Sequence, residues 1–474
     1  MKLYEQVAHS IAERIEQSFY QTGEKLPSIR SLSLTHEVSI STAQEAYRLL
    51  EDQGWAESRP KSGFYVINKQ KAPQHLPDLS RPIQKPIEIS QWEEVLNLLC
   101  ASTTSDIVQL SRAIPDLEAP TLKPLTRIMS DLNKHAQASM LSYESLRGAD
   151  SLRLQIARLM VDSGCRLHPD DIIITTGCQE ALSASLRAIT QPGDIVAVDS
   201  PSFYGSMQAI KAHGLKAIEI PTHPETGISL EALELALEQW PIKAIQLTPT
   251  CNNPLGYTMP VEHKKRLLEL TSRYDLPIIE DDIYGDLSYI SPRPPSIKSF
   301  DTQGRVLLCS SFSKTLAPGL RIGWVAPGRY VNLVMHMKYV VTASTSTLPQ
   351  HAIAEFIAQG GYERHIRKMR AQYHQSRDVM IGWVEKYFPV GTKISYPQGG
   401  FVLWVELSDE IDTVILNERT MRQNVSIAPG MLFSGSGKYS NCMRLNFTDK
   451  PSVKNENAIK TVGNMVSKML TDLL

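Results

Sequence analysis

Residues 309–324 read CSSFSKTLAPGLRIGW, where an apolar run gives way to hydroxyls, an amine and a guanidinium. Ser311, Ser313 and Lys314 stand at the end of a predicted strand, and Arg321 follows a Pro-Gly loop. Strand ends in open α/β sheets face the ligand crevice, so these side chains are expected to converge there. The hydroxyls and Arg321 suit a phosphate, and a positioned, neutral Lys314 suits attack on an aldehyde. Taken alone, a lysine after serines is more typical of a solvated loop.

Short β-branched runs alternate with helical segments around this stretch, from about residue 89 onward. The predicted strands are 171–177, 194–200, 244–250, 276–282 and 305–311, and the helices between them include 179–190, 203–213 and 260–274. Such alternation is typical of an α/β fold with a mainly parallel sheet and helices on both faces. Strands at 399–407 and 442–448 and a helix near 453–472 predict a smaller α+β subdomain over about 375–474.

Two neighbouring strand ends add acidic, phenolic and amide groups. In LPIIEDDIYGDL (276–287), Asp281 follows a buried run and Tyr284 comes three residues later. A carboxylate there can pair with a ring nitrogen and keep it protonated, as an electron-sink cofactor requires. A pair of acids near water at a strand terminus is the alternative. Asn253, after another strand, can donate to a phenolic oxygen or serve only the turn Asn-Pro-Leu-Gly.

The remaining strand ends suggest an anion site and a stacking ring. Cys178 and Gln179 begin a predicted helix after Gly177, and free backbone N–H groups at a helix start bind anions. Many α/β loops have the same pattern. Phe203, two residues after Pro201, can stack on a heteroaromatic ring or belong to the core.

The first 70 residues have a different texture from the rest of the chain. An amphipathic helix over the first 20 residues, a short helix over 27–36, a third over roughly 40–53 and two short strands within 55–67 predict a winged helix-turn-helix. Residues 71–88, rich in Pro, Gln and Lys, predict a semi-rigid linker, and 89–474 form the body.

The composition excludes several classes of protein. The chain has 474 residues and a formal net charge of -1, so no global field recruits nucleic acid or an anionic membrane. Six cysteines lie far apart without a C-x-x-C pair, which favours a reducing compartment over a disulfide framework or a zinc ribbon. The start of the chain lacks the apolar run of a signal peptide, and no stretch is long and apolar enough for a membrane span. We expect a cytoplasmic protein with no metal site.

In their order and spacing, the chemical groups of the body resemble fold-type I pyridoxal-phosphate (PLP) enzymes of the aspartate aminotransferase superfamily, over roughly residues 100–470. The resemblance implies that Lys314 bonds the cofactor aldehyde and that Arg444 grips a substrate carboxylate. It implies cofactor contacts from Asp281, Tyr284, Asn253, Phe203, Cys178, Gln179, Ser311, Ser313 and Arg321, and from Tyr143 across a subunit interface. Leu255 departs from the family's usual Asn-Pro-Thr-Gly motif.

The head resembles a GntR-type winged helix, on the Leu-Pro-Ser-x-Arg run at 26–30, the Val-Ser turn at 38–39 and a wing glycine. The resemblance implies DNA contacts from Ser28, Arg30, Ser41, Thr42, Gln44, Tyr47, Arg48, Lys61 and Gly63. Ile40 and Gln44 stand where many relatives carry arginine, and residues 1–70 hold eight Lys/Arg against nine Asp/Glu. A winged helix that makes only protein contacts is therefore the alternative.

A GntR-like head, a linker and an aminotransferase-like body together resemble the MocR family of transcriptional regulators. The resemblance implies a homodimer that binds double-stranded operator DNA and senses PLP itself or an amino compound. The alternative is a working aminotransferase with a vestigial or regulatory head, because the groups for transamination are present. The basic run YERHIRKMRAQYHQSRD (362–378) is predicted to be a solvated helix face.

Overall fold

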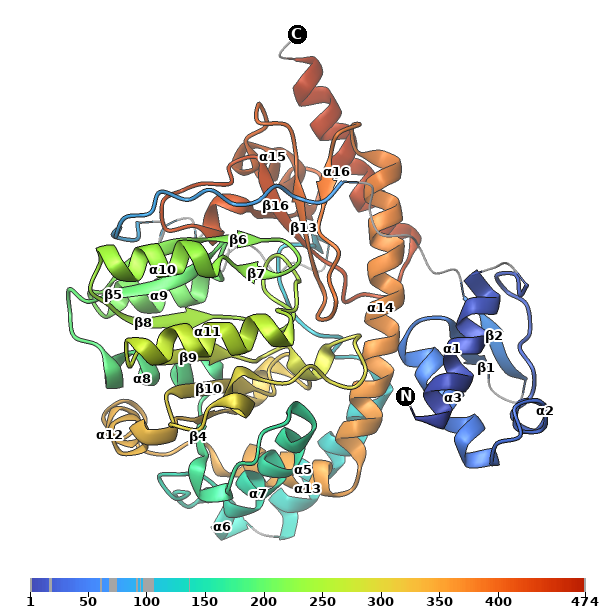
Figure 1. The fold of residues 1–474 in the computed structure, drawn as a ribbon, viewed down its shortest axis with the longest axis horizontal. Helices are drawn as coiled ribbons and strands as arrows, with labels where there is room; N and C mark the ends of the chain where they lie inside the picture. Colours follow the sequence, from blue (N-terminus) through green and yellow to red (C-terminus); the bar gives the residue numbers. More distant parts are fainter. Residues whose placement is uncertain are drawn as a thin grey trace.

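The computed structural model describes residues 2–16, 19–59, 62–67, 75–90, 93, 95–96, 106–135 and 137–472. The head and the body lie on opposite sides of one long helix, α14 (Gly361–Tyr387), as Figure 1 shows. Within the described parts of the chain, no helix combines the length and the apolar character needed to cross a membrane.

The head is a three-helix unit closed by a hairpin. Its elements are α1 (Leu3–Glu16), α2 (Ile29–Thr35), α3 (Ile40–Asp52), β1 (Ala56–Arg59) and β2 (Gly63–Val66). Ser39 caps α3 by accepting a hydrogen bond from the backbone N–H of Thr42, and β1 pairs antiparallel with β2. This is the predicted winged helix-turn-helix, except that α2 begins after Ser28 rather than at Pro27, because the Ser28 side chain caps it.

The body is built on an eight-stranded mixed sheet. The strands lie in the order β4-β11-β10-β9-β8-β5-β6-β7, and the central pairs from β10 to β6 are parallel. The strands are β4 (Ile173–Thr175), β5 (Ile195–Ser200), β6 (Lys216–His223), β7 (Gly227–Ile228), β8 (Ile242–Leu247), β9 (Ile278–Asp281), β10 (Val306–Ser311) and β11 (Gly323–Ala326). The predicted α/β class is confirmed.

Helices cover both faces of this sheet because successive strand residues point to opposite sides. Val196 and Val198 pack with α8 (Cys178–Ile189), α9 (Tyr204–Ala212) and α12 (Val331–Val341), whereas Ala197 packs with α10 (Leu230–Gln239) and α11 (Val261–Arg273). Further helices of this part are α5 (Lys123–His135), α6 (Gln137–Leu141), α7 (Asp150–Leu159) and α13 (Thr347–Ala358).

A smaller antiparallel sheet completes the body, in the order β12-β13-β16-β15. Its part of the chain contains β12 (Lys393–Ile394), β13 (Val402–Glu406), α15 (Thr413–Met421), β14 (Val425–Ser426), β15 (Ala428–Pro429), β16 (Cys442–Asn446) and α16 (Val453–Thr471), and β14 pairs with β3 (Val108–Gln109). The boundary predicted near residue 375 falls inside α14, which is continuous over 27 residues. One helix therefore belongs to both parts of the body and also contacts the head.

Candidate functional site

A cavity lies at the carboxyl ends of β5, β8, β9 and β10. It holds about 670 Å³ of space not filled by atoms, part of it open to solvent. The lining residues are Cys178, Gln179, Leu182, Phe203, Thr248, Asn253, Asp281, Ile283, Tyr284, Ser311, Ser313, Lys314, Pro318 and Arg321. The predicted cofactor residues therefore meet in one cavity, with the exception of Tyr143, which is 90% exposed on the surface. Thr248 is a lining residue that the sequence patterns did not single out.

Lys314 is held in the cavity three residues beyond the end of β10. Its Nζ donates to the backbone carbonyl of Ala113 at 2.6 Å. Burial and, as the second cause, the nearby Arg444 guanidinium together lower the pKa of Lys314 to about 8, against the opposing charge of Asp281. A lysine with this pKa is partly neutral near physiological pH, which a nucleophilic amine requires.

Asp281 is the last residue of β9 and is buried beside the start of α8. Its Oδ1 accepts hydrogen bonds from the backbone N–H of Ile283 at 3.2 Å and from Cys178 Sγ at 3.5 Å. Burial raises the pKa of Asp281 to about 6. A cationic ring nitrogen beside this carboxylate would offset the cost of burying its charge.

Tyr284 and Asn253 approach the cavity from two different strand ends. Tyr284 is buried, its pKa is raised by burial, and its Oη has no hydrogen-bond partner among the described residues. Asn253 Oδ1 accepts from Arg444 Nη1 at 3.2 Å. A buried hydroxyl without a partner is costly, so the phenol of Tyr284 favours a ligand oxygen in this cavity.

Arg321 closes the cavity at the start of α8. It adopts a left-handed backbone conformation (φ 52°), and its Nη2 donates to the carbonyl of Thr176 at 2.9 Å. A Cβ on Gly177 would lie 2.5 Å from the same Nη2, so only glycine allows the guanidinium to lie across the helix start. Ser311 Oγ accepts from the N–H of Ser313 at 3.2 Å. The free N–H groups of α8, the guanidinium and the two hydroxyls form a corner suited to an anion.

Arg444 on β16 is fully buried just behind the cavity. Its Nη2 donates to the carbonyl of Ser111, its guanidinium lies 5.1 Å from the ring centre of Phe433, and its Nε has no partner among the described residues. Arg444 does not line the cavity but touches Asn253, which does. The guanidinium is thus placed one side chain away from the lysine.

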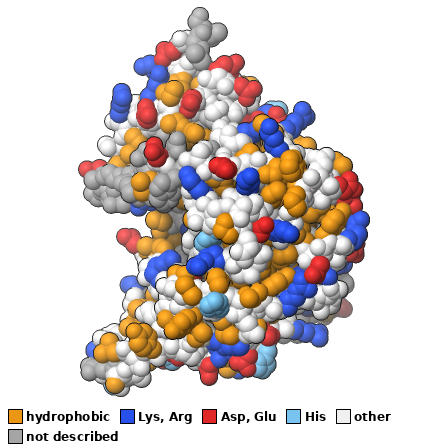
Figure 2. Space-filling view, turned by 90° about the vertical axis from the view of Figure 1, so that its left-hand side faces the viewer, with side chains coloured by type: hydrophobic (Ala, Val, Ile, Leu, Met, Phe, Trp, Pro, Cys, Tyr) orange, Lys and Arg blue, Asp and Glu red, His pale blue; other side chains and the backbone are white. Residues whose placement is uncertain are grey.

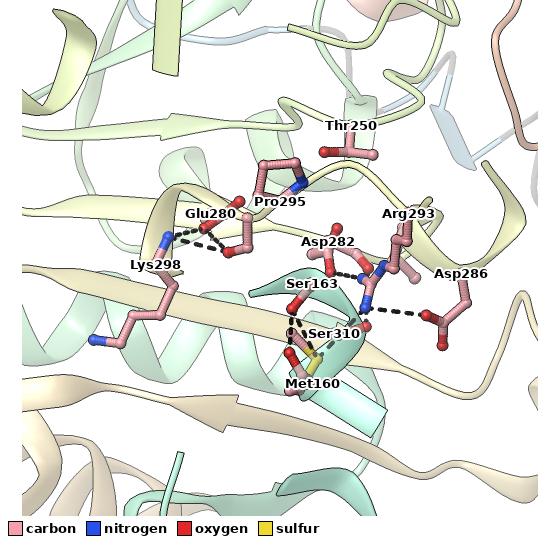
Figure 3. A network of polar contacts seen from close by, with 12 residues as sticks. Met160, Ser163, Thr250, Glu280, Asp282, Asp286, Arg293, Pro295, Lys298 and Ser310 are labelled. Carbon is pink, nitrogen blue, oxygen red and sulfur yellow. Dashed lines mark hydrogen bonds and ion pairs between the residues drawn. The ribbon is translucent and has the colours of Figure 1, made fainter. Parts of the chain in front are cut away.

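A buried ionic network, drawn in Figure 3, lies directly behind β9. Arg293 pairs with Asp282 and, at 3.1 Å, with Asp286. Asp286 in turn accepts from the hydroxyl of Tyr362 at 2.5 Å, and its carbonyl accepts from Arg370 Nε at 2.6 Å. The network therefore joins the strand that ends at the cavity to α14. No local pattern in the sequence indicates this network, since its members are spread from Asp282 to Arg370.

The exposed face of the head carries most of the predicted DNA residues. Ser28, Arg30, Ser41, Gln44 and Arg48 are exposed, and Thr42 is half-buried. Gly63 begins β2 in a left-handed conformation (φ 113°), next to the exposed Lys25, which the sequence patterns did not single out. Lys61 lies outside the described residues.

Tyr47 corrects the prediction for this face. It is fully buried, its ring stacks on Phe64 with centres 4.1 Å apart, and its hydroxyl donates to the carbonyl of Pro27. Tyr47 therefore holds α3 to α2 and the hairpin and is not available to the major groove. The helical periodicity of α3 explains why Tyr47 is buried, because Tyr47 lies on the same apolar face as Ala43 and Leu50.

The carboxyl end of α3 packs against α14. A Cβ on Gly54, which has φ 71°, would lie 2.5 Å from the ring of His374. Burial raises the pKa of Asp52, and the charge of the Arg370 guanidinium on α14 opposes that rise. The basic run was predicted to be solvated, which is wrong for Arg377. Its side chain is buried, with Nη1 donating to the carbonyl of Pro397 at 2.8 Å.

Comparisons with known proteins agree with this two-part architecture. Residues 3–66 match the family model for bacterial regulatory proteins of the gntR family, and residues 105–462 match aminotransferase class I and II. The HTH-type transcriptional regulator YjiR of Escherichia coli is 50% identical over 470 residues, which cover 99% of this chain and 100% of that protein.

Several solved structures resemble the body. The multiple substrate aminotransferase of Thermococcus profundus has a TM-score of 0.74 at 31% identity and covers 81% of this chain and 96% of its own. The kynurenine aminotransferase of Pyrococcus horikoshii has a TM-score of 0.73 at 32% identity, with the same coverage. Since relatives such as YjiR match over their entire length, the chain belongs to the MocR-type family of HTH-type transcriptional regulators, in which a gntR-family head is joined to an aminotransferase class I and II body.

Proposed function

We propose that this protein is a DNA-binding transcriptional regulator whose body binds PLP through Lys314 and senses PLP itself or an amino compound. The observation that carries the proposal is a half-buried lysine with a lowered pKa, in a cavity with a corner suited to an anion, on the same chain as a gntR-family head. When bound, PLP would supply an aldehyde for amino groups and an electron sink.

The donor set of the cavity fits PLP. Lys314 would bond the aldehyde, Asp281 would hold the ring nitrogen, and the unpartnered Tyr284 hydroxyl and Asn253 would meet the phenolic oxygen. Phe203 would lie against the ring. The phosphate would be held by Cys178, Gln179, Ser311, Ser313 and Arg321.

Arg444 gives the effector a chemical class. Its buried guanidinium is positive and its Nε lacks a partner among the described residues, so a carboxylate arriving beside Asn253 would satisfy it. An amino acid carries both a carboxylate for Arg444 and an amine that can displace Lys314.

The contact between α3 and α14 provides a route from the cavity to the head. Arg370 donates to the carbonyl of Asp286 on one side, and on the other its charge acts on Asp52 of the head; Asp286 is paired with Arg293 behind β9. An effector changes DNA affinity by this route only if it binds two head arrangements unequally. The free energy that couples the effector site to DNA binding equals the difference in effector binding free energy between the two head arrangements.

We also propose a homodimer. Exposed apolar side chains gather at one end of the body, and Figure 2 shows hydrophobic side chains clustered on the lower part of the face that contains α12. Tyr339, Val340 and Val341 of α12 are 64%, 58% and 59% exposed, and Leu141 is 86% exposed beside Tyr143. A second copy would cover this surface, and Tyr143 would reach the partner's cavity.

The complete donor set also supports a second candidate, aminotransferase activity. Asp281, Tyr284, Lys314 and Arg444 are all present, and solved relatives of the body are aminotransferases. Steady turnover of an amino donor with a keto acid would favour this candidate. A single half-turnover would exclude it and leave the sensor.

The decisive experiment is the visible absorption spectrum of the protein reconstituted with PLP, followed by borohydride reduction and mass spectrometry. Wild-type protein is expected to gain a stable adduct on Lys314, and Lys314→Ala to gain none. Lys338→Met is the matched control, because the pKa of Lys338 is also lowered to about 8 by burial but this lysine does not line the cavity.

DNA binding is then measured with and without amino acids. Lys314→Ala is expected to bind operator DNA and to lose the response to amino acids. Wild-type protein that forms no adduct with PLP would overturn the proposal.

A further inference from the structure

The first two turns of α3 offer few free groups to a ligand. Ser39 Oγ lies 2.8 Å from the hydroxyls of both Ser41 and Thr42, so the N-cap occupies both. Arg48 Nη1 is bonded to Glu45 at 3.0 Å. Gln44 is exposed, and within the described chain its amide has no hydrogen-bond partner. Gln44 is therefore the polar side chain of this helix end that makes no hydrogen bond within the described chain.

Ile40 lies one turn before Gln44 on the same side of α3. It is the first residue of the helix and 52% exposed, although it is a large aliphatic side chain. A single exposed isoleucine is common on protein surfaces. Here Ile40 lies beside the amide of Gln44, at the amino end of the helix that a winged helix places in the major groove. The capping bond of Ser39 fixes the position of this helix end.

The body leaves this end of the helix uncovered. The residues of α3 and its turn that line the hollow beside Ser291 and Pro292 of the body or pack on α14 are Glu45, Leu49, Asp52, Gln53 and Gly54, from the middle of the helix to its carboxyl end. Ile40 and Gln44 lie at the other end. One helix is thus divided into a docking half and a half that remains exposed while the head is docked.

We propose, on the basis of the proposed DNA-binding function, that Ile40 and Gln44 together determine operator specificity by recognising a thymine and an adenine close together in the major groove. Ile40 packs on the thymine C5-methyl group, and Gln44 bonds adenine N6 and N7 bidentately. Residues one turn apart are separated by about 5–6 Å, which is between one and two base-pair steps of about 3.4 Å. The two bases therefore lie in adjacent base pairs or two apart.

The test uses the full-length protein with a duplex selected from a random pool. Each thymine is replaced singly by uracil, which removes only the methyl group, and each adenine by 7-deazaadenine, which removes the N7 acceptor. At one thymine, wild-type binding is expected to fall about 4-fold, the value of one buried methyl group. At one adenine within two base pairs, it is expected to fall by about 5-fold or more.

Two variants assign these effects to the two side chains. Ile40→Ala is expected to bind the thymine and uracil duplexes with equal affinity. Gln44→Ala is expected to bind the adenine and 7-deazaadenine duplexes with equal affinity. Leu34→Ala, which removes an aliphatic side chain that is 81% exposed on α2, is the control and should keep both effects. Wild-type protein that binds a selected duplex but is indifferent to uracil at every thymine overturns the role of Ile40 and leaves the regulator intact. Failure to select any duplex overturns both proposals.

Discussion

The head and the body treat their polar groups in opposite ways. The body buries charged side chains around its cavity, including Asp281, Arg444 and Arg293, and holds Lys314 half-buried within it. In the head, over residues 2–16, 19–59 and 62–67, the buried side chains are apolar apart from the hydroxyl of Tyr47 and the indole N–H of Trp55. Buried charges have shifted pKa values and suit chemistry, whereas exposed charges on a firm apolar core suit contact with a partner. Substitutions should therefore affect the two regions differently.

The largest effect is expected from emptying the core of the head. Tyr47→Ala removes a fully buried ring that stacks on Phe64, which should lower the free energy of unfolding of the head by about 3–5 kcal/mol. DNA binding should disappear while the PLP adduct on Lys314 forms normally. Hydrogen exchange resolved by segment measures the first effect and mass spectrometry the second.

Tyr47→Phe is the matched control for that experiment. It keeps the stacked ring and loses only the bond to the Pro27 carbonyl, at a cost of about 1 kcal/mol. If Tyr47→Ala also abolished the PLP adduct, the head and the body would unfold as one unit, and the contrast between them would fail.

An intermediate effect is expected from pH in the body. Because the pKa of Lys314 is lowered to about 8, the amine is protonated below that pH and neutral above it. The rate of covalent capture of PLP by cofactor-free protein should therefore rise with pH and level off above about 8. Stopped-flow absorbance measures the rate.

Arg444→Gln sharpens this test. The Arg444 charge is the second cause of the low pKa after burial, so its removal should move the midpoint to higher pH, by up to about one unit. Arg419→Gln, which removes a half-exposed cation on α15, should leave the midpoint unchanged. A rate that does not change with pH would contradict the lowered pKa.

The smallest effect is expected at the junction between the two regions. Gly54 and Gly23 both have positive φ angles, but a Cβ on Gly54 would meet His374, whereas a Cβ on Gly23 meets nothing within 4 Å. Each substitution to alanine should cost the head about 1 kcal/mol of backbone strain. Gly54→Ala alone should also loosen the head from α14.

Hydrogen exchange at residues 367–378 of α14 in the full chain separates the two variants. Faster exchange in Gly54→Ala than in Gly23→Ala is expected. Equal exchange would mean that the docked contact contributes nothing to the stability of α14.

Much of the fold could be predicted because local patterns agreed with it. The helices of the head and the strands that end at the cavity follow apolar periodicity, and cap residues such as Ser39 mark their limits. Strand ends also predicted the cavity, since parallel strands bring their carboxyl ends to one edge. Asp281 and Lys314 were found in this way, although their pKa values depend on burial that the sequence does not specify.

The unpredicted features depend on contacts between distant segments. Arg293 stands in a proline-rich stretch and acquires its role only through Asp282 and Asp286. Tyr47 was assigned to DNA through the family resemblance, although it shares the apolar face of α3 with Ala43 and Leu50, and its stacking on Phe64 of β2 appears only in the structure. The continuity of α14 across the predicted boundary at residue 375 likewise follows from packing on both sides.

The length of α14 has a mechanical consequence. From Arg370 to its carboxyl end at Tyr387, beside α16, the helix extends about 25 Å at 1.5 Å per residue. A tilt of about 8° about that end displaces the seat of the head by about 3.5 Å, which matches the 3.4 Å rise of one base pair. Over this length, a sub-ångström shift near the carboxyl end of α14 would become a displacement of about one base-pair step at the head.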